Sequence, residues 1–390
     1  MRASEGWVVV FSGGGTGGHL YPALALAGAL RALRPDVRAF FVGARRGIEA
    51  RILPARGEEH LLVQVEGFRR DGPLLANLSV VVRLLGALVE TGRTLHRLRP
   101  RAVVVTGGYA GGPAGLLAVL MRIRLVLQEQ NAVPGVTTRA LSLFAHEVHL
   151  AFPEAIEHLP RPARPRVRFT GNPVVPPSPV EEAHGRFGLV AGRPVVLVVG
   201  GSQGSLALNR GVLDAVTQVV RGNGHGPGRD ARERPLPDLQ LLWSTGPTHL
   251  EGVQAGLEAL GRPAWVHAVG YIDDMPAALG IAALAVSRAG AMATSEFLAW
   301  GVPSILVPLP TAAADHQTSN ARALHKAGAA ILLPEEELDG RVLWAWIARI
   351  IGDRAARERM ARAAHDRGQP GAAETLARSL ERLLPPGGAR

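Results

Sequence analysis

Residues 7–19 read Trp7-Val-Val-Val-Phe-Ser-Gly-Gly-Gly-Thr-Gly-Gly-His19, and this stretch decides the fold class. The β-branched and aromatic run from Val8 to Phe11 is typical of a buried parallel strand. The glycines after it predict a tight loop, and the apolar residues that recur every three or four positions up to Leu30 predict a helix. A strand, a glycine loop and a helix in this order form the basic unit of a doubly wound α/β sheet.

The same succession returns further along the chain. Strand-like runs at Ala102–Val105, Val195–Val199 and Ala282–Val286 are each followed by a glycine-containing loop and a helical pattern. Strands that alternate with helices at this spacing predict parallel sheets with right-handed crossovers. In such sheets ligands bind beyond the carboxyl ends of the strands, so we expect the glycine loops to line the functional site.

A proline-rich segment divides the chain. Residues Gly171–Val180 contain four prolines and predict a stiff linker. We therefore expect two Rossmann-like, doubly wound parallel-sheet α/β domains that face a cleft, over residues 1–172 and 173–365. The Gly-, Pro- and charge-rich stretch Arg221–Pro237 predicts a surface loop, to which no function is assigned.

The 390 residues carry 43 basic and 33 acidic side chains, a net charge of +10. Residues 1–170 hold 22 Arg and 12 acidic residues, so the excess belongs to the first domain. The absence of cysteine excludes a disulfide framework, a thiolate nucleophile and cysteine-ligated metals. The longest uncharged apolar stretches are too short for a membrane span, and Trp7–Phe11 predicts a strand instead of a secretory signal. We expect a cytoplasmic protein.

The loop Gly13-x-Gly15-x-x-Gly18 formally matches the dinucleotide-binding fingerprint. That interpretation needs an acidic residue near the end of the second strand, and none follows Ala39–Val42. A P-loop is also excluded, because no Gly-Lys-Ser/Thr follows the glycines. Two alternatives are left: an anion site made of loop N–H groups and a helix N-terminus, or glycines that serve only the turn.

The second domain offers a similar loop, Gly200-Gly-Ser-Gln-Gly204, where a phosphate would take N–H bonds and one bond from Ser202. Glu296 is either a solvated helix residue or an acceptor-only carboxylate that suits a vicinal diol such as a ribose. The adjacent Asp273 and Asp274 do not indicate a metal site, because no His/Asp/Glu cluster has credible ligand spacing.

Seven motifs between residues 12 and about 330 together resemble the MurG family. In order they are Gly13-Gly-Gly-Thr-Gly-Gly-His19, Gly107-Gly-Tyr-Ala-Gly-Gly-Pro113, Glu129-Gln-Asn-Ala-Val-Pro-Gly135, Gly171-Asn-Pro-Val174, Gly200-Gly-Ser-Gln-Gly204, Gly270-Tyr-Ile-Asp-Asp-Met275 and Asp315-His-Gln-Thr-Ser-Asn-Ala321. The resemblance implies a GT-B glycosyltransferase that transfers N-acetylglucosamine (GlcNAc) from UDP-GlcNAc to undecaprenyl-pyrophosphoryl-MurNAc-pentapeptide (lipid I), making lipid II for peptidoglycan. It also implies that a helix in residues 366–390 returns to the first domain.

The resemblance implies a role for individual residues. The second domain would bind the donor through Ser202, Ile272, Arg288, Ala291, Met292, Ala293, Thr294, Ser295, Glu296 and Gln317. The first domain would approach the donor sugar with Thr16, Gly17, Gly18 and Asn131. The acceptor side would be lined by Gly14, Gly15, His19, Tyr109 and Glu129.

Two positions depart from the family pattern. Val175 stands where the family has Arg after Gly-Asn-Pro-Val, and Ala293 stands where the nucleotide loop has Thr. Each change removes one expected polar contact with the donor. Neither position carries the chemistry, so we expect altered donor affinity and retained function.

The implied reaction is an inverting displacement, in which the C4 hydroxyl of MurNAc attacks the anomeric carbon and UDP leaves. Loop amides, helix N-termini and Ser202 would stabilise the leaving diphosphate, with no metal or other cofactor. His19 is the first candidate for the general base, because histidine titrates near neutral pH, and Glu129 is the second. The alternative role for His19 is to bind the pyrophosphate of lipid I.

A lipid-linked acceptor requires contact with a membrane. An apolar stretch with arginines around it comprises Leu74, Leu75, Leu78, Val81, Val82, Leu84, Leu85 and Leu88 with Arg69, Arg70, Arg83, Arg93 and Arg97. A buried core helix explains the leucines, but the charge of the first domain favours a surface that meets anionic lipid. The implied location is the cytoplasmic face of the cell inner membrane, as a peripheral protein.

Two other functions fit parts of the sequence. A UDP-GlcNAc 2-epimerase on the same fold would share the second domain, but it would not need the Glu129-Gln-Asn131 loop or the basic apolar stretch. A nucleic-acid binder would explain the charge, yet only 5% of the residues are aromatic and no basic cluster is interleaved with aromatics. We therefore expect UDP-GlcNAc, lipid I and an anionic membrane as partners, and no nucleic acid.

Overall fold

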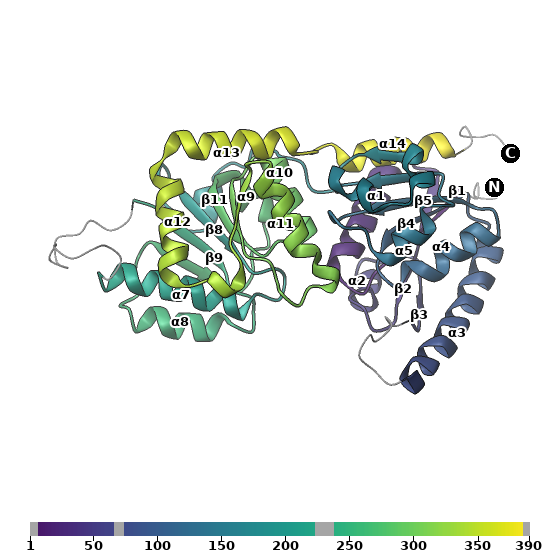
Figure 1. Cartoon of the computed structure of the whole chain (residues 1–390), viewed down its shortest axis with the longest axis horizontal. Coiled ribbons are helices and arrows are strands. Elements are labelled where there is room, and N and C mark those ends of the chain that lie inside the picture. The colour runs from purple at the N-terminus through teal and green to yellow at the C-terminus, as the bar shows by residue number, and fades with distance from the viewer. Residues whose placement is uncertain (1–6, 66–73, 223–237, 385–390) are drawn as a thin grey trace. The chain divides into compact units, whose positions relative to one another are not determined.

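The structure is a computed structural model that describes residues 7–65, 74–222 and 238–384, with the backbone alone for 74–81. The chain divides into two compact units (Figure 1). Unit 1 comprises Met1–Val174 and Gly371–Arg390, and unit 2 comprises Val175–Pro370. Most of the surface loop expected at Arg221–Pro237 lies outside the described residues.

The described strands of unit 1 form one parallel sheet in the order β3-β2-β1-β4-β5-β6-β7. Their bounds are β1 Trp7–Gly13, β2 Val37–Ala44, β3 His60–Val63, β4 Ala102–Gly107, β5 Arg124–Glu129, β6 Glu147–Leu150 and β7 Val167–Phe169. The central strand β1 pairs with β2 on one side and β4 on the other, so that Phe11 lies opposite both Phe41 and Val104. The strand order reverses between β1 and β4, which makes this the topological switch point where ligands bind.

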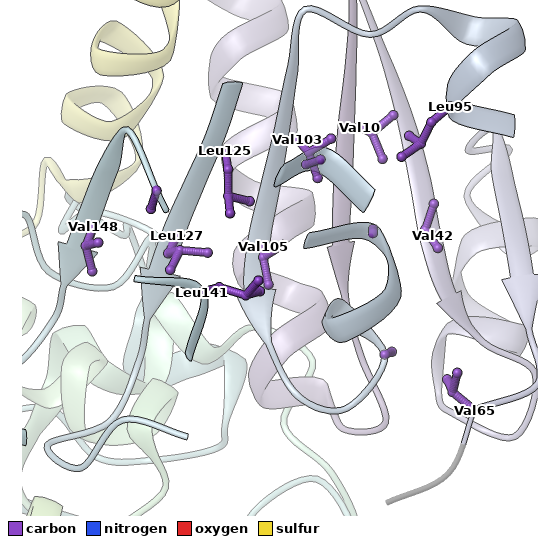
Figure 2. Close-up of a cluster of buried hydrophobic side chains, with 14 of the residues drawn as sticks. Val10, Val42, Val65, Leu95, Val103, Val105, Leu125, Leu127, Leu141 and Val148 are labelled. Carbon is purple, nitrogen blue, oxygen red and sulfur yellow. The ribbon is translucent and has the colours of Figure 1, made fainter. Parts of the chain in front are cut away.

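Helices cover both faces of this sheet. They are α1 Gly17–Leu33, α2 Glu49–Ala55, α3 Leu74–Leu98, α4 Gly111–Leu120, α5 Val136–Leu141 and α14 Ala372–Leu383, with 3-10 turns η1 Pro153–His158 and η2 Arg161–Arg166. Successive residues of β1 point to opposite faces, so Val10 joins one buried cluster and Val9 and Phe11 join another. Figure 2 shows the first cluster, in which Val10 and Val103 project from neighbouring strands. Burial on both faces explains why these strands are apolar almost throughout.

The last helix, α14, belongs to unit 1. Its residues Leu376, Ala377 and Leu380 are buried in the same cluster as Val9 and Phe11, and the helix packs against α1. Figure 1 shows α14 beside α1 at the C-terminal end of the chain. Two segments from opposite ends of the sequence therefore share one hydrophobic core.

Unit 2 repeats the same architecture. Its described strands are parallel in the order β10-β9-β8-β11-β12-β13, with the switch point between β8 and β11. The strands are β8 Val195–Val199, β9 Gln240–Ser244, β10 Val266–Val269, β11 Ala282–Ser287, β12 Ser304–Leu306 and β13 Ala330–Leu332. The helices are α6 Ala183–Arg186, α7 Leu206–Val220, α8 Leu250–Glu258, α9 Met275–Ile281, α10 Ala291–Trp300, α11 His316–Lys326, α12 Gly340–Gly352 and α13 Arg354–Arg367, with 3-10 turns η3 Ala313–Asp315 and η4 Glu335–Glu337.

The prediction of two doubly wound parallel sheets is confirmed. In unit 1 the glycine loops follow β1 and β4, the two strands at its switch point. In unit 2 the loops with Ser202 and Arg288 follow β8 and β11, the equivalent pair. Each unit therefore presents its glycine loops at the position where such sheets bind ligands.

Candidate active site

The first glycine loop, Gly13–Gly18, connects β1 to α1 and is shaped by close approaches. A Cβ on Gly13 would lie 2.0 Å from Thr106 Oγ1, and one on Gly15 would lie 2.7 Å from the Tyr109 ring. Gly15 also has a φ of +91°, which a residue with a side chain rarely adopts. Thr16 is the N-cap of α1 but its side chain accepts no capping bond, so the helix N-terminus at Gly17 and Gly18 lacks a side-chain cap.

One amide of this loop is already bonded to the protein. Glu49, which is completely buried at the start of α2, accepts the Gly15 N–H at 2.7 Å and the Ala44 N–H at 2.9 Å through Oε1. The expectation that the loop offers bare N–H groups therefore does not hold at Gly15. Glu49 was not predicted from the sequence, although the two glycines near it, Gly43 and Gly47, are an available signal.

His19 lies in the first turn of α1 and has a defined tautomer. Its Nδ1 is 3.0 Å from the Thr106 carbonyl oxygen and 2.9 Å from Gln130 Oε1. Because a carbonyl oxygen only accepts, Nδ1 carries a proton, so in the neutral ring the lone pair is on Nε2. Gln130 is held in turn, since its Nε2 donates to the Thr106 carbonyl at 2.7 Å. This arrangement fixes the ring and leaves Nε2 able to accept a proton.

The loop after β4 completes the surroundings of His19. A Cβ on Gly107 would lie 3.0 Å from His19 Nδ1, and one on Gly108 would lie 2.3 Å from the Gly14 carbonyl oxygen. Only glycines allow the two loops to come this close, which explains the first half of the Gly-Gly-Tyr motif. Tyr109, 38% exposed, covers Gly15. The structure thus brings together the predicted acceptor-side residues that belong to the loops after β1 and β4.

Glu129 is the last residue of β5 and Asn131 lies on the loop after it, and the Glu129 carboxylate holds that loop. Glu129 is buried, and its Oε1 accepts the Asn131 backbone N–H at 3.1 Å and the Asn131 side-chain amide at 3.3 Å. Its Oε2 accepts the Gly135 N–H at 3.2 Å. Both oxygens of this carboxylate are occupied by N–H groups of the loop, so the geometry favours His19 over Glu129 as a base.

In unit 2 the loop Gly200–Gly204 connects β8 to α7. Gly204 has a φ of +78°, and a Cβ there would lie 2.1 Å from the Thr245 carbonyl oxygen. Ser202 lies exposed in the loop, whereas Ser205 is buried and caps α7 by accepting the Leu208 N–H at 3.3 Å. Ser202, whose hydroxyl was predicted to bind a phosphate, is therefore exposed, whereas Ser205 has a structural role as the cap of α7.

Arg288, which follows β11, is surrounded by protein partners. Its Nε donates to Ser205 Oγ at 2.9 Å, and its Nη1 donates to the carbonyls of Val307 and Pro308 at 3.2 Å. Its Nη2 forms an ion pair of 2.5 Å with Glu335. The buried guanidinium thus ties the cap of α7 to the loop after β12 and to η4. A direct contact with a donor, as the sequence suggests, stays a prediction.

Helix α10 begins at Ala291 with Gly290 as its N-cap and no side-chain cap. Thr294 is turned inward, because its hydroxyl donates to the Gly290 and Ala291 carbonyls at 3.0 Å. Met292 is half-buried and Ser295 is buried. Glu296 is half-buried, and desolvation by the surrounding protein raises its pKa to about 7. A perturbed carboxyl group one turn from an uncapped helix N-terminus is typical of a binding site.

Two further predicted positions, Ile272 and Gln317, have defined surroundings in unit 2, as does Asp274, which was not predicted to bind a ligand. Ile272 is buried, so its backbone is the part that a base would meet. Gln317 Oε1 accepts the Leu309 N–H at 3.0 Å, which fixes the side chain at the start of α11. Asp274 caps α9 by accepting the Ala277 N–H at 3.1 Å, and it also pairs with Arg186. This carboxylate is therefore structural.

The contacts described above do not involve Val175 and Ala293, the two positions that depart from the family pattern. Val175 is 56% exposed, and its carbonyl accepts a bond from Trp300 Nε1 at 3.3 Å. Ala293 is half-buried in the first turn of α10.

The described residues contain no group of three or more His, Asp or Glu residues placed to hold a metal ion. They also contain no helix that is long and apolar enough to cross a membrane.

Models of glycosyltransferase family 28 match both units of the chain. The model of its N-terminal domain matches residues 9–150, and that of its C-terminal domain matches residues 195–376. A curated UDP-N-acetylglucosamine–N-acetylmuramyl-(pentapeptide) pyrophosphoryl-undecaprenol N-acetylglucosamine transferase from Salinibacter ruber is 38% identical over 375 residues, 95% of each chain. The chain belongs to the MurG family of glycosyltransferases. The family resemblance suggested by the seven motifs is confirmed.

Solved structures agree with this assignment. The crystal structure of MurG from Acinetobacter baumannii matches with a TM-score of 0.73 and 29% identity, covering 96% of this chain and 99% of the other. The prediction of a GT-B glycosyltransferase is thereby confirmed. The crystal structure of a Listeria monocytogenes protein described as a UDP-N-acetylglucosamine 2-epimerase matches with a TM-score of 0.65 but only 16% identity. The match covers 97% of this chain and 96% of the other. The likeness to that epimerase shows the fold alone.

Proposed function

We propose that this protein transfers GlcNAc from UDP-GlcNAc to the C4 hydroxyl of MurNAc in lipid I and so makes lipid II. The observation that carries the proposal is the 38% identity over 95% of the chain to an enzyme named for this reaction. The MurG family places such an enzyme in peptidoglycan synthesis, and therefore in cell-wall biogenesis, cell shape and cell division.

The donor binds to unit 2 in this proposal. The uncapped N-terminus of α10 would receive the diphosphate through the N–H groups around Met292, because a helix N-terminus attracts anions. Ser202, exposed on the loop after β8, would add one bond. Glu296 would accept both ribose hydroxyls when ionised. Arg288 would act through Ser205, by holding the cap of α7 and with it the glycine loop.

His19 is the general base in this proposal. Its Nδ1–H is committed to Thr106 and Gln130, so Nε2 is the nitrogen that would take the proton from the attacking hydroxyl. The Glu129 carboxylate, which accepts N–H bonds on both oxygens, would position Asn131 beside the donor sugar. The developing charge on UDP would be stabilised by the fixed dipoles of the loops and helix N-termini.

In this proposal the surface of unit 1 formed by α3 and α4 would meet the membrane. Val82, Leu85 and Val89 are 62%, 58% and 52% exposed and recur along one face of α3. Leu116 and Leu120 of α4, which packs against α3, are 43% and 68% exposed. Exposed apolar residues in the positively charged part of the chain fit the headgroup region of an anionic bilayer. Arg69 and Arg70 lie outside the described residues, as do the side chains of Leu74, Leu75, Leu78 and Val81.

The test is UDP release from UDP-GlcNAc, with and without a short-chain lipid I analogue, in the presence of EDTA. Release that depends on the acceptor supports the transferase and excludes an obligatory divalent metal. Release without acceptor, together with formation of ManNAc, contradicts the proposal and indicates an epimerase. An electrophoretic shift with nucleic acid at physiological salt would revive the nucleic-acid alternative.

A further inference from the structure

Three buried amide side chains lie behind the ring of His19. Gln128 is on β5, Gln130 follows that strand directly, and Asn172 belongs to the Gly171-Asn-Pro-Val174 motif after β7, to which no function has been assigned above. None of the three amides is more than 1% exposed. Buried amides destabilise a fold unless their donors and acceptors are bonded, so their partners show what they do.

The three amides form a continuous chain of hydrogen bonds that ends at His19. Asn172 Nδ2 donates to the Gln130 carbonyl at 3.1 Å, and Asn172 Oδ1 accepts from Gln128 Nε2 at 2.8 Å. Gln128 Oε1 accepts in turn from Gln130 Nε2. Gln130 Oε1 lies 2.9 Å from His19 Nδ1. Every side-chain nitrogen and oxygen of the three amides therefore has a partner, as expected of a network that specifies one arrangement.

Two backbone carbonyls fix the direction of this chain. A carbonyl oxygen only accepts, so the Asn172 atom beside the Gln130 carbonyl is the nitrogen, and the Asn172 oxygen faces Gln128. Gln130 Nε2 also donates to the Thr106 carbonyl at 2.7 Å, which turns Gln130 Oε1 toward His19. Reversal of any one amide would bring two oxygens or two NH₂ groups together. The chain therefore offers His19 Nδ1 only an acceptor, and a ring protonated at Nε2 alone would place a bare Nδ1 against two oxygens.

We infer that Gln130 is a positioning residue that selects the Nδ1–H form of His19, and that Gln128 and Asn172 hold Gln130 in the orientation this requires. Thr106 supports the same form, because its carbonyl accepts from the ring and its Oγ1 donates to the His19 carbonyl at 2.7 Å. In the neutral ring Nε2 then keeps its lone pair for the substrate. The inference rests on the proposed function for the role of Nε2 as the base, whereas the selection of the tautomer does not depend on catalysis.

Two substitutions interrupt the chain at its two ends. Gln130→Met keeps a long unbranched side chain but removes the acceptor for His19 Nδ1, and Asn172→Ala removes the last amide. Gln240→Met is the matched control. Gln240 is an equally buried amide in unit 2, where it accepts from the Val190 N–H at 2.7 Å and donates to the Val190 carbonyl at 2.9 Å.

The first experiment reads the tautomer of the free protein. Two-bond ¹H–¹⁵N correlations of ¹⁵N-histidine-labelled protein, recorded above about pH 8.5 where histidine is neutral, distinguish a protonated ring nitrogen from a bare one. The His19→Asn variant identifies the His19 signals by their absence. We expect a protonated Nδ1 in the wild type and in Gln240→Met. In Gln130→Met the ratio of the Nε2–H form to the Nδ1–H form should rise about three- to tenfold, because one hydrogen bond to Nδ1–H is lost.

The second experiment is a double-mutant cycle on kcat. Gln130→Met should lower kcat about tenfold at an unchanged KM for UDP-GlcNAc, since the Thr106 carbonyl still holds part of the ring, and Asn172→Ala should lower it about threefold. If Asn172 acts through Gln130, the double variant should be no slower than Gln130→Met alone, because the effects of coupled residues do not add. Gln240→Met should keep the wild-type kcat.

Each part of the inference has its own contrary result. A neutral His19 protonated at Nε2 in the wild type, or an unchanged tautomer ratio in Gln130→Met, would overturn the selection by Gln130. Additive losses of kcat in a folded double variant would overturn the role of Asn172. If Gln130→Met does not fold, Gln128→Met interrupts the same chain one bond further from His19, and an unchanged ratio there would overturn the inference.

The proposed function fails separately. If the wild type shows no UDP release that depends on the acceptor, the transferase proposal is wrong. The tautomer spectrum needs no substrate, so it still decides whether Gln130 selects the form of His19.

Discussion

Ser379 of the C-terminal helix α14 donates a hydrogen bond to the carboxylate of Glu147 on β6, although 232 positions of sequence separate them. His149 contributes a second contact at 3.1 Å and Arg168 a third at 3.2 Å. Burial alone would raise the pKa of Glu147, but the bonds from His149 and Ser379 lower it to about 2. The end of the chain is thus attached to the sheet of unit 1 by polar as well as apolar contacts.

Glu147→Gln should loosen this attachment. A carboxylate whose folded pKa lies below its unfolded value of 4.5 contributes stability above about pH 4.5 and loses it as the pH falls toward 2. After a discount for partial exposure we expect a loss of about 1–2 kcal/mol in the unfolding free energy at pH 7, and a smaller difference at pH 3. Urea titrations at both pH values measure it. Glu374→Gln is the control, because Glu374 forms an exposed pair with Arg378 on the same helix; an equal loss in both variants would refute the special role of Glu147.

Glu296→Gln should have the opposite effect on stability. The pKa of Glu296 is raised to about 7, so the folded protein holds a proton that the unfolded chain releases above about pH 4.5. The wild type therefore loses stability between about pH 4.5 and 7, and the variant does not. We expect the variant to be more stable by about 1–3 kcal/mol at pH 8 and equal near pH 4. Glu336→Gln, at an exposed position in η4, is the control for the change in net charge.

Donor binding should follow the same titration. An ionised Glu296 accepts two ribose hydroxyls, so the KM for UDP-GlcNAc should rise as the pH falls below about 7. In Glu296→Gln the KM should be higher at all pH values and should lose that dependence. A pH profile of KM that is identical in the two proteins would remove Glu296 from the donor site.

The two roles of His19 can be separated with a variant that preserves the loop. His19→Asn places an amide N–H where Nδ1 now donates to Thr106 and Gln130, but it has no equivalent of Nε2. If His19 is the base, kcat should fall about 10²- to 10⁴-fold while the acceptor KM changes little. A higher acceptor KM with unchanged kcat would instead identify His19 as a ligand of the pyrophosphate.

Arg288→Ala tests whether this guanidinium acts on the donor directly or through the protein. The change leaves Glu335 without its ion pair and Ser205 without its donor, so the loss of stability should be large, about 3–5 kcal/mol. A rise in the KM for UDP-GlcNAc should accompany it, because the cap of α7 is no longer held. If the KM rises in a variant of unchanged stability, a direct contact with the donor is the better explanation.

The sequence predicted the fold well because the deciding signals are local. The apolar runs, glycine loops and helical patterns around Val8–Phe11 and Val195–Val199 each lie within one β-loop-α unit, and such units recur along the chain. The predicted acceptor-side residues Gly14, His19 and Tyr109 lie together for the same reason, since their loops follow adjacent strands.

What the sequence could not predict are contacts between distant segments. Gly43 and Gly47 indicate that space is needed near Glu49 but not that its carboxylate lies beneath Gly15, because that contact depends on the pairing of β1 with β2. Arg288 is of a residue type that often binds phosphate. Only the folded unit shows that Ser205 and Glu335 are its partners. The sequence cannot distinguish an arginine that binds a phosphate from one that pairs with a carboxylate of the protein, because the guanidinium group binds both.

The last prediction concerns the membrane. Exposed Val82, Leu85 and Val89 would enter the headgroup region, and arginines such as Arg93 and Arg97 would add about 1 kcal/mol each when they lie close to anionic lipid. Vesicles with phosphatidylglycerol should therefore bind the protein, and binding should weaken steeply between 50 and 500 mM salt because charge attraction is screened. Leu85→Ser with Val89→Ser should weaken binding at every salt concentration, whereas Arg93→Gln with Arg97→Gln should reduce the salt dependence. Binding to neutral vesicles that equals binding to anionic ones would show that the charge of unit 1 serves another purpose.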